Sequence, residues 1–209
     1  MSAADALHGR WRALWSGDAV DGDAIYRDLV ARYAEPHRAY HTLDHVADCL
    51  HWLDEVRPLL ARPDEAEWAI WFHDAVYDPQ RADNEERSAA LAAEALTALA
   101  VDAAVGARVA DLIRLTSHTT DALTADGAVV CDIDLAILGA PPQRFEQYDA
   151  AIRQEYAWVP EAIFRRERKR VLAGFLGRPR IYHTFVMSEK CERQARVNIA
   201  QLLSRYQGV

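Results

Sequence analysis

Apolar residues recur along most of the chain at the three- and four-residue spacing of amphipathic helices, and no segment alternates convincingly as a half-buried strand does. This pattern predicts an all-α fold, a single helical bundle of about eight to ten helices. The first six predicted helices are Asp21–Tyr33, His41–Leu60, Pro63–Val76, Arg87–Ala100, Asp102–Ile113 and Ala128–Leu138. Pro141-Pro142, Pro160 and Pro179 then separate three further helical stretches.

Polar residues and glycine mark several helix boundaries. Pro63-Asp64 followed by Glu67 has the spacing of a capping box, and Asp83 with Glu86 repeats it. Gly139 directly follows an apolar segment and is a typical residue at which a helix ends. Because the chain has neither an internal repeat nor a low-complexity linker, one domain over residues 1–209 is expected.

Composition narrows the class of protein. The 209 residues are 51 % hydrophobic, enough for a substantial core, yet no apolar run approaches the about 20 residues that span a membrane. The N-terminus carries no recognisable secretory signal, and the three cysteines are too widely spaced for a disulfide framework or a thiolate zinc site. The net charge of −8 disfavours nucleic acid as a partner. We therefore expect a soluble cytoplasmic protein without a membrane partner, and its oligomeric state stays open.

Four ionisable residues in the predicted helices are candidates for metal ligands: His45, His73, Asp74 and Asp134. A helix rich in apolar residues rarely carries two adjacent ionisable groups, such as His73-Asp74, unless they have a partner. Two imidazoles and two carboxylates form a mixed nitrogen and oxygen set that suits a hard or borderline divalent metal. Four ligands would leave two positions of an octahedron for water and substrate, which is the outline of a hydrolytic site.

Helical spacing distinguishes between neighbouring candidates. His41 and His45 are four residues apart, so on one helix both imidazoles project from the same face. Asp132 and Asp134 point to nearly opposite sides, because successive residues of a helix turn by about 100°. Asp134 falls within the apolar stripe of its helix, and a buried carboxylate needs a compensating charge. Asp134 is therefore the predicted ligand. Asp132 is expected either to orient a metal ligand without binding the metal itself, or to lie on the helix surface.

Three segments carry a resemblance to a known superfamily: Tyr40–Val46, Trp71–Asp74 and Asp132–Leu135. Their order of His, His-Asp and Asp on separate helices resembles the signature of the HD-domain metal-dependent phosphohydrolases, and the chain is similar to a bacterial branch of that superfamily. The resemblance covers most positions from about 20 to 200 and also includes Asp83–Ala89, Thr116–Thr119, Leu138–Ala140 and Arg178–Tyr182. It implies an all-α fold with a metal among the central helices, held by the four ligands above. It also implies hydrolysis of a phosphate ester or anhydride by a metal-bound hydroxide.

His41 has a more specific counterpart. The Tyr-His-x-x-x-His spacing of residues 40–45 is similar to that of the cyclic-nucleotide phosphodiesterases, in which the first histidine donates a proton and the second binds the metal. A proton donor at His41 agrees with the near-neutral pKa of imidazole. The rest of the chain departs from the phosphodiesterases, so a structural role for His41 stays open as the alternative.

Three further residues are candidates for contacts with substrate or water. His118 lies in a Ser/Thr-rich loop after a predicted helix and either contacts phosphate, binds a second metal or caps the helix end. Arg38, three residues before His41, is a candidate to hold a phosphate oxygen. Glu85 is a candidate to orient a ligand or water, although an acid in a first helical turn also simply favours the helix dipole.

The leading hypothesis is a divalent-metal phosphohydrolase that acts on a small phosphorylated metabolite, with nucleotides as the first class to test. The alternative is a non-catalytic module that uses the metal or the pocket to bind or sense a phosphorylated ligand. An oxygenase with two irons is a third interpretation, but it normally needs more histidine ligands than His118 adds. One divalent ion is expected, with room for a second, and the ligand types leave Mn, Mg, Fe, Co, Ni and Zn open.

Two other patterns are expected to be structural. The six tryptophans are predicted to be packing residues: Trp11, Trp15, Trp52, Trp68, Trp71 and Trp158. The basic run Arg165–Arg170 contains an internal glutamate and is predicted to be a solvated helix face rather than a phosphate or nucleic-acid patch.

Overall fold

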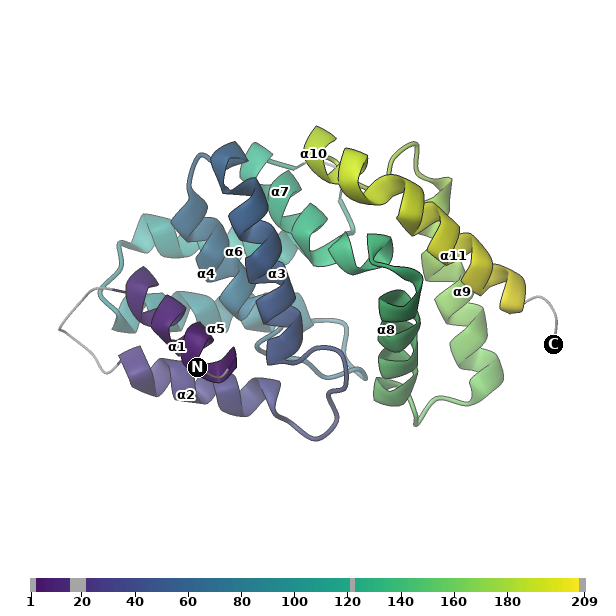
Figure 1. Cartoon of the computed structure of the whole chain (residues 1–209). Coiled ribbons are helices and arrows are strands. Elements are labelled where there is room, and N and C mark those ends of the chain that lie inside the picture. The colour runs from purple at the N-terminus through teal and green to yellow at the C-terminus, as the bar shows by residue number, and fades with distance from the viewer. Residues whose placement is uncertain (1–2, 16–21, 121–122, 207–209) are drawn as a thin grey trace. The chain divides into compact units, whose positions relative to one another are not determined.

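The structure, a computed structural model, describes residues 3–15, 22–120 and 123–206, and this part of the chain contains no β-strand (Figure 1). Nine α-helices, α1 to α9, are followed by one continuous helical run that comprises α10, the π-helical segment η3 and α11. With this run counted as one helix, the described residues contain ten helices, which confirms the predicted all-α fold of eight to ten helices. No described helix is long and apolar enough to cross a membrane.

The chain divides into two compact units, residues 1–130 and 131–209. The prediction of one domain over the whole chain stays a prediction. In the first unit the elements are α1 (Ala3–Leu14), α2 (Gly22–Tyr33), α3 (Leu43–Val56), η1 (Arg57–Leu59), α4 (Pro63–Phe72), α5 (Asn84–Ala98) and α6 (Ala103–Leu115). Helix α7 (Ala125–Asp134) begins in the first unit and ends in the second. The second unit continues with η2 (Leu135–Gly139), α8 (Pro142–Glu155), α9 (Glu161–Gly177), α10 (Phe185–Met187), η3 (Ser188–Glu192) and α11 (Arg193–Arg205). Asp21, the predicted start of the second helix, lies outside the described residues.

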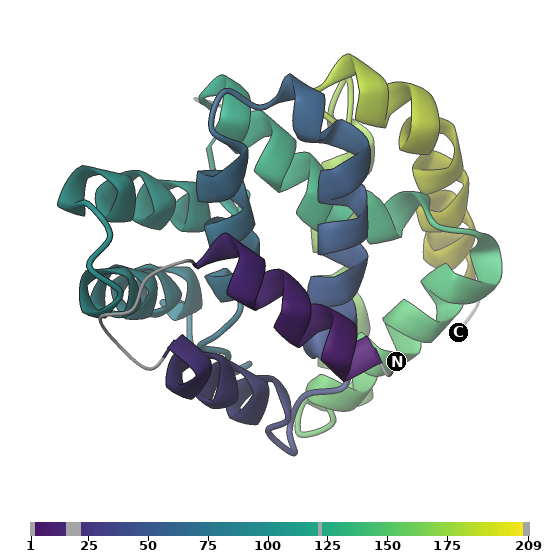
Figure 2. The ribbon, with the colours of Figure 1, turned by 60° about the vertical axis from the view of Figure 1, so that its left-hand side comes forward.

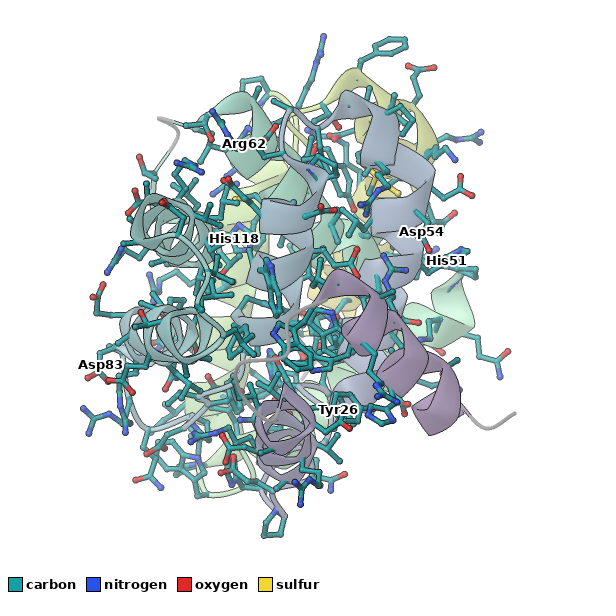
Figure 3. The ribbon with its side chains drawn as sticks, turned by 90° about the vertical axis from the view of Figure 1, so that its left-hand side faces the viewer. Tyr26, His51, Asp54, Arg62, Asp83 and His118 are labelled. Atoms are coloured by element: carbon teal, nitrogen blue, oxygen red, sulfur yellow. The ribbon has the colours of Figure 1, made fainter. Side chains whose placement is uncertain are left out.

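An aromatic cluster between α1, α2 and α4 forms much of the core of the first unit. Trp11 packs edge-on against Trp68 and Trp71, with ring centroids 5.1 and 5.5 Å apart. Tyr26 of α2 reaches toward α1 (Figure 3), and its ring centroid lies 6.0 Å from that of Trp11. These three tryptophans are buried, so the removal of their apolar surface from water stabilises the unit. The packing role is confirmed for them but is wrong for Trp158, which is 56 % exposed in the turn after α8.

Arg10 connects α1 to α3 and α4. Its guanidinium donates to both carboxylate oxygens of Glu67, at 2.8 and 3.1 Å, and to Asp54 at 2.7 Å. Arg57 donates to the same Glu67 carboxylate at 3.0 Å, so this buried acid has two cationic partners. Figure 2 shows the result, with α1 lying across α3.

Neither of the two predicted capping boxes forms. Glu67 is occupied by its arginine partners, and the backbone N–H groups of residues 61 and 62 donate instead to Asp126 at 2.9 and 3.0 Å. Glu86 pairs with Arg114 rather than with the start of α5. At both glutamates an arginine from elsewhere in the unit competes for the carboxylate, and sequence spacing along one helix cannot reveal that competitor.

Asp132 holds the segment that leads into α10. Its carboxylate is fully buried and accepts the backbone N–H groups of His183 and Thr184 at 2.7 Å each. Burial raises the pKa of Asp132, and the two hydrogen bonds only partly oppose that rise. The expected place for Asp132 on a helix surface is therefore wrong, because a chain segment with N–H groups to satisfy covers that side of α7.

Two close contacts fix the end of η2 and the start of α11. Glu192 accepts the backbone N–H groups of Ile181 and Tyr182 within 3.2 Å. Gly139 ends η2 as predicted, and the reason is steric. A Cβ atom at this position would lie 2.6 Å from the Cβ atom of Cys191 and 2.9 Å from its Cα atom.

The basic run on α9 is paired within the second unit. Arg165 and Arg170 bind Glu161 and Glu167 through contacts of 2.5 and 3.0 Å. Arg168 binds Asp149 of α8 at 3.1 Å. These pairs confirm the acidic partners of the run, but Arg168 is largely buried, so the prediction of a solvated face is wrong for that residue.

We predict that Asp132→Asn lowers the free energy of unfolding by about 1–3 kcal/mol, the cost of a buried donor without an acceptor. The amide has only one oxygen, so one of the two backbone N–H groups faces an NH₂ group. Urea unfolding followed by circular dichroism measures the change. Glu146→Gln is the control, because this exposed residue pairs with Arg205 at the surface and its loss should cost less than about 1 kcal/mol. Equal stability of Asp132→Asn and the wild type would contradict the assigned role.

Candidate metal centre

His45 enters the centre from the first turn of α3. The helix begins at Leu43, because Thr42 before it has an extended backbone with φ −118° and ψ 179°. The His45 residue is only 2 % exposed. His41 lies in the loop before α3, which corrects the prediction that His41 and His45 share one helix face.

His73 stands at the C-terminal end of α4. Its backbone N–H donates to the carbonyl of Ala69 at 2.8 Å, and its ring nitrogen Nδ1 lies 2.9 Å from the carbonyl oxygen of Ile70. Because a carbonyl only accepts, Nδ1 carries the proton in this contact. The other nitrogen, Nε2, then has a lone pair in the neutral ring, and such an anchored tautomer is typical of histidines that bind metals.

The chain leaves the helix directly after His73. Helix α4 was predicted through Val76 but ends at Phe72. The backbone carbonyls of Asp74 and Ala75 accept hydrogen bonds from Arg38, at 2.7 and 3.2 Å. The Ser88 hydroxyl of α5 bonds to both the N–H and the carbonyl of Val76, at 3.0 and 3.2 Å. Side chains thus replace the helical partners of these backbone groups, and the turn they hold presents Asp74 beside His73.

Three donor atoms form a compact triangle. Nε2 of His45 lies 3.1 Å from Nε2 of His73, and the Asp74 oxygen Oδ2 lies 3.0 Å from the His73 nitrogen and 3.5 Å from the His45 nitrogen. Ligands bound about 2.1 Å from one metal stand about 3.0 Å apart along the edge of an octahedron and about 3.4 Å apart in a tetrahedron. The triangle therefore has the size and the donor set of one face of a divalent-metal site.

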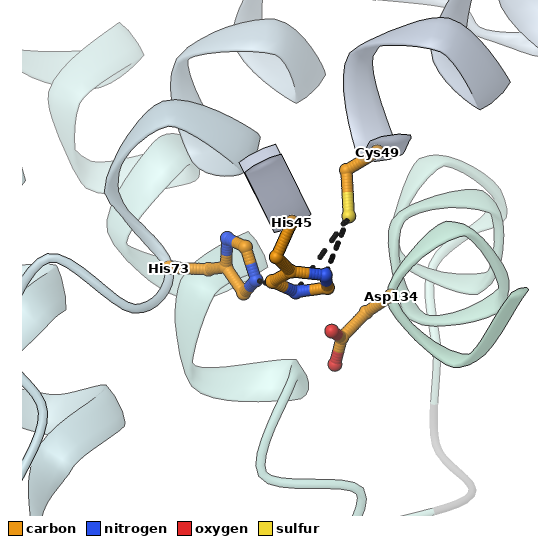
Figure 4. Close-up of side chains that lie close together, drawn as sticks. All are labelled: His45, Cys49, His73 and Asp134. Carbon is orange, nitrogen blue, oxygen red and sulfur yellow. Dashed lines mark hydrogen bonds between the residues drawn. The ribbon is translucent and has the colours of Figure 1, made fainter. Parts of the chain in front are cut away.

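A second, overlapping group extends the possible ligand set. The ligand atoms of His45, Cys49 and His73, all in the first unit, lie within 4.8 Å of one another (Figure 4), and a group of this kind could hold a metal ion. Asp134 is the last residue of α7 and is partly buried. Of the four predicted ligands, the two histidines belong to both groups and Asp74 to the first, whereas Asp134 lies in the second unit and its role as a ligand stays a prediction.

Cys49 is the member of this group that the sequence reasoning missed. It lies one turn after His45 on α3, so the His-x-x-x-Cys spacing was the available signal. Its buried sulfur is 3.7 Å from both ring nitrogens of His45. A sulfur equally far from Nδ1 and Nε2 does not lie on the axis of the Nε2 lone pair. In this arrangement Cys49 packs against the His45 ring, and the triangle supplies the donor atoms that face one another.

His41 lies near the donor triangle, where it affects the charge of Asp74 and packs against Tyr77. Burial alone would raise the pKa of Asp74, but the neighbouring His73 and His41 charges, with a hydrogen bond from His73, hold that pKa well below its ordinary value. The His41 ring stacks on Tyr77, with centroids 4.1 Å apart and planes 29° apart. The centroid of His41 also lies 6.1 Å from that of His45. His41 is thus held within electrostatic reach of Asp74 without belonging to the donor triangle.

The other predicted site residues have different surroundings. The Arg38 side chain is completely buried and bonds to the protein, which corrects the expected contact with a substrate phosphate. Glu85 is half-buried in the first turn of α5. His118 follows α6 with a positive φ of 54°, and its N–H bonds to the carbonyl of Leu115 at 3.0 Å. Neither Glu85 nor His118 belongs to the metal-binding group found among the described residues.

Comparisons with protein-family models, curated proteins and solved structures found no match for this chain. The assignment of the centre therefore depends on its own geometry and on the sequence motifs.

His118 and Ala100 offer a test of backbone strain at two helix ends. Both have positive φ, 54° and 57°, and a left-handed backbone costs a residue with a Cβ atom about 1–2 kcal/mol. Glycine removes this cost but loses more entropy on folding. We therefore predict that His118→Gly and Ala100→Gly each raise the free energy of unfolding by about 1 kcal/mol. Urea unfolding of both variants provides the measurement. A loss of stability in His118→Gly beside a gain in Ala100→Gly would show that the imidazole contributes more than the strain costs.

Proposed function

We propose that the protein is a divalent-metal-dependent phosphohydrolase that acts on a small phosphorylated metabolite, with nucleotides as the first substrates to test. The observation that carries the proposal is the triangle of His45 Nε2, His73 Nε2 and Asp74 Oδ2, with edges of 3.0 to 3.5 Å. The resemblance of the motif segments to the HD-domain phosphohydrolases points to the same chemistry. In this proposal Asp134 is the fourth ligand.

The donor set favours some metals over others. Two imidazole nitrogens suit Fe, Ni or Zn better than Mg, which prefers oxygen ligands and water. A divalent ion bound here would supply Lewis-acid activation of water and of a phosphate oxygen. The anchored Nδ1 of His73 keeps Nε2 directed at the ion, and the low pKa of Asp74 keeps its carboxylate charged and ready to bind.

His41 is the proposed general acid. Water adds to phosphorus and loses one proton to solvent, while the bond from phosphorus to the leaving oxygen breaks and the electron pair departs with that oxygen. A ring nitrogen of protonated His41 gives its proton to the departing oxygen, so that an alcohol rather than an alkoxide leaves. The stacking of His41 on Tyr77 and the negative charge of Asp74 support this role, because one orients the ring and the other favours its protonated form.

Replacement of the proposed ligands tests the metal assignment. We predict that His73→Ala abolishes metal binding and hydrolysis while the helical content stays close to that of the wild type, because a ligand is lost at the end of an intact helix. His51→Ala is the matched control, since His51 is exposed on α3 (Figure 3) outside the donor groups. Asp134→Asn should lower metal occupancy more than Asp132→Asn. Metal analysis of the purified variants and circular dichroism check these outcomes. One metal ion per chain and full activity in His73→Ala would disprove the assigned site.

A second prediction tests the mechanism. His41→Ala should retain the metal but slow the hydrolysis of an alkyl phosphoester by roughly 10²–10⁴-fold, the usual effect of losing a general acid. The loss should be smaller for a nitrophenyl phosphoester, because its leaving group is acidic and needs little protonation. Metal content and turnover on both substrates separate the possible roles of His41. If His41 were a ligand, its replacement would also remove the metal, and if its role were structural, the hydrolysis of both substrates would slow equally. A bound metal without turnover on any phosphoester in the wild type would favour the binding-module alternative.

A further inference from the structure

Arg38 lies in an unusual environment for a positive charge. Its side chain has no exposed surface, and the carbon at the centre of the guanidinium is 5.1 Å from the ring centroid of Tyr33 and 5.4 Å from that of Tyr77. Glu35 is its charged partner, with Nε donating to the carboxylate at 3.0 Å. Such a buried cation is costly unless its N–H groups are satisfied, so the identity of its other partners decides its role.

The other partners are backbone carbonyls on two separate segments. Nη1 donates to the carbonyl of His41 at 3.0 Å and to that of Asp74 at 2.7 Å, and Nη2 donates to the carbonyl of Ala75 at 3.2 Å. One nitrogen therefore joins the residue proposed as the general acid to a residue proposed as a metal ligand. Four of the five N–H groups of the guanidinium are directed at the protein.

We propose that Arg38 is a positioning residue that sets His41 and Asp74 at a fixed separation, and so controls both metal affinity and the place of the proton donor. The inference depends on the proposed function of the centre. The fork of the guanidinium is planar and rigid, so its two Nη1 bonds and its Nη2 bond hold the loop before α3 and the turn after α4 in one arrangement. The Tyr77 ring contacts the Arg38 guanidinium and also stacks on His41. Tyr77 therefore adds a second connection between the turn after α4 and the loop before α3.

Lysine cannot perform this task. Its single ammonium nitrogen keeps the charge and the contact with aromatic rings, but it cannot reach Glu35 and three carbonyls in the geometry of a planar fork. Arg38→Lys therefore retains the electrostatics while it removes the fixed separation. Arg10 is a suitable control for the loss of a multiply bonded arginine, because its guanidinium bonds to Glu67 of α4 and to Asp54 and the Leu50 carbonyl of α3, away from the loops of the centre.

The experiment compares Arg38→Ala, Arg38→Lys and Arg10→Ala with the full-length wild-type protein. Titration with Zn²⁺ or Fe²⁺ measures the dissociation constant of the metal, and amide hydrogen exchange measures the opening of residues 39–42 and 73–77. We expect both Arg38 variants to weaken metal binding by about 10–100-fold, as the loss of a residue that orients a ligand does. Exchange in the two segments should become faster in both. Millimolar guanidinium should restore metal affinity and protection in Arg38→Ala, whereas methylammonium should not, and Arg10→Ala should change neither property.

The outcomes distinguish this inference from the proposed function. Metal affinity within about twofold of the wild type in both Arg38 variants, or an equal loss in Arg10→Ala, would overturn the positioning role. If Arg38→Ala does not fold, Arg38→Lys decides the question by the same measurements. If the wild type itself binds no metal, the proposed function fails, and hydrogen exchange alone then decides: unchanged exchange in both segments of the Arg38 variants would overturn the inference.

Discussion

The contact between Nε2 of His45 and Nε2 of His73, 3.1 Å long and buried, is the constraint on which the candidate metal centre depends. Two imidazole lone pairs repel at this distance unless a proton or a cation lies between them, and the Asp74 oxygen beside both nitrogens favours positive charge there. The bond from His73 Nδ1 to the Ile70 carbonyl decides which nitrogen faces the centre. A metal ion satisfies all three donors at once, and for this reason the geometry supports a metal centre better than an isolated ion pair.

The irregular segments around the centre are as important as the helices. His41 stands outside α3 because that helix starts only at Leu43, and Asp74 lies in a turn because α4 already stops at Phe72. The backbone groups that leave the helical pattern still need partners, and Arg38 and Ser88 provide them. The motif segment Asp83–Ala89 thereby acquires a structural explanation, since Ser88 holds the turn that carries Asp74 and Asn84 bonds to Asp78 just beyond it.

The sequence predicted the histidines and aspartates of the centre as a set, but not the surroundings of each. Helical phase placed Asp134 toward the interior and Asp132 on the opposite side of the helix, but it could not show that the backbone of residues 183 and 184 covers Asp132. Cysteine spacing argued against a thiolate site and so drew attention away from Cys49, one turn from His45. Arg38 was a candidate to hold a phosphate oxygen because it lies three residues before His41, but its side chain is buried between two tyrosines and bonds to the protein.

The sequence by itself determined the helical class, the approximate positions of the helices from α2 onward and the order of the candidate ligands, whereas α1 (Ala3–Leu14) was not predicted. These properties follow from local periodicity and residue chemistry, which act over one or two turns of a helix. Only the tertiary structure decided which carboxylates receive arginine partners, where α4 ends, and that His41 stands outside α3 against Tyr77. Each of these outcomes depends on a group that is distant in sequence and competes for the same hydrogen bond or the same buried space, and no pattern along a single helix contains that competitor.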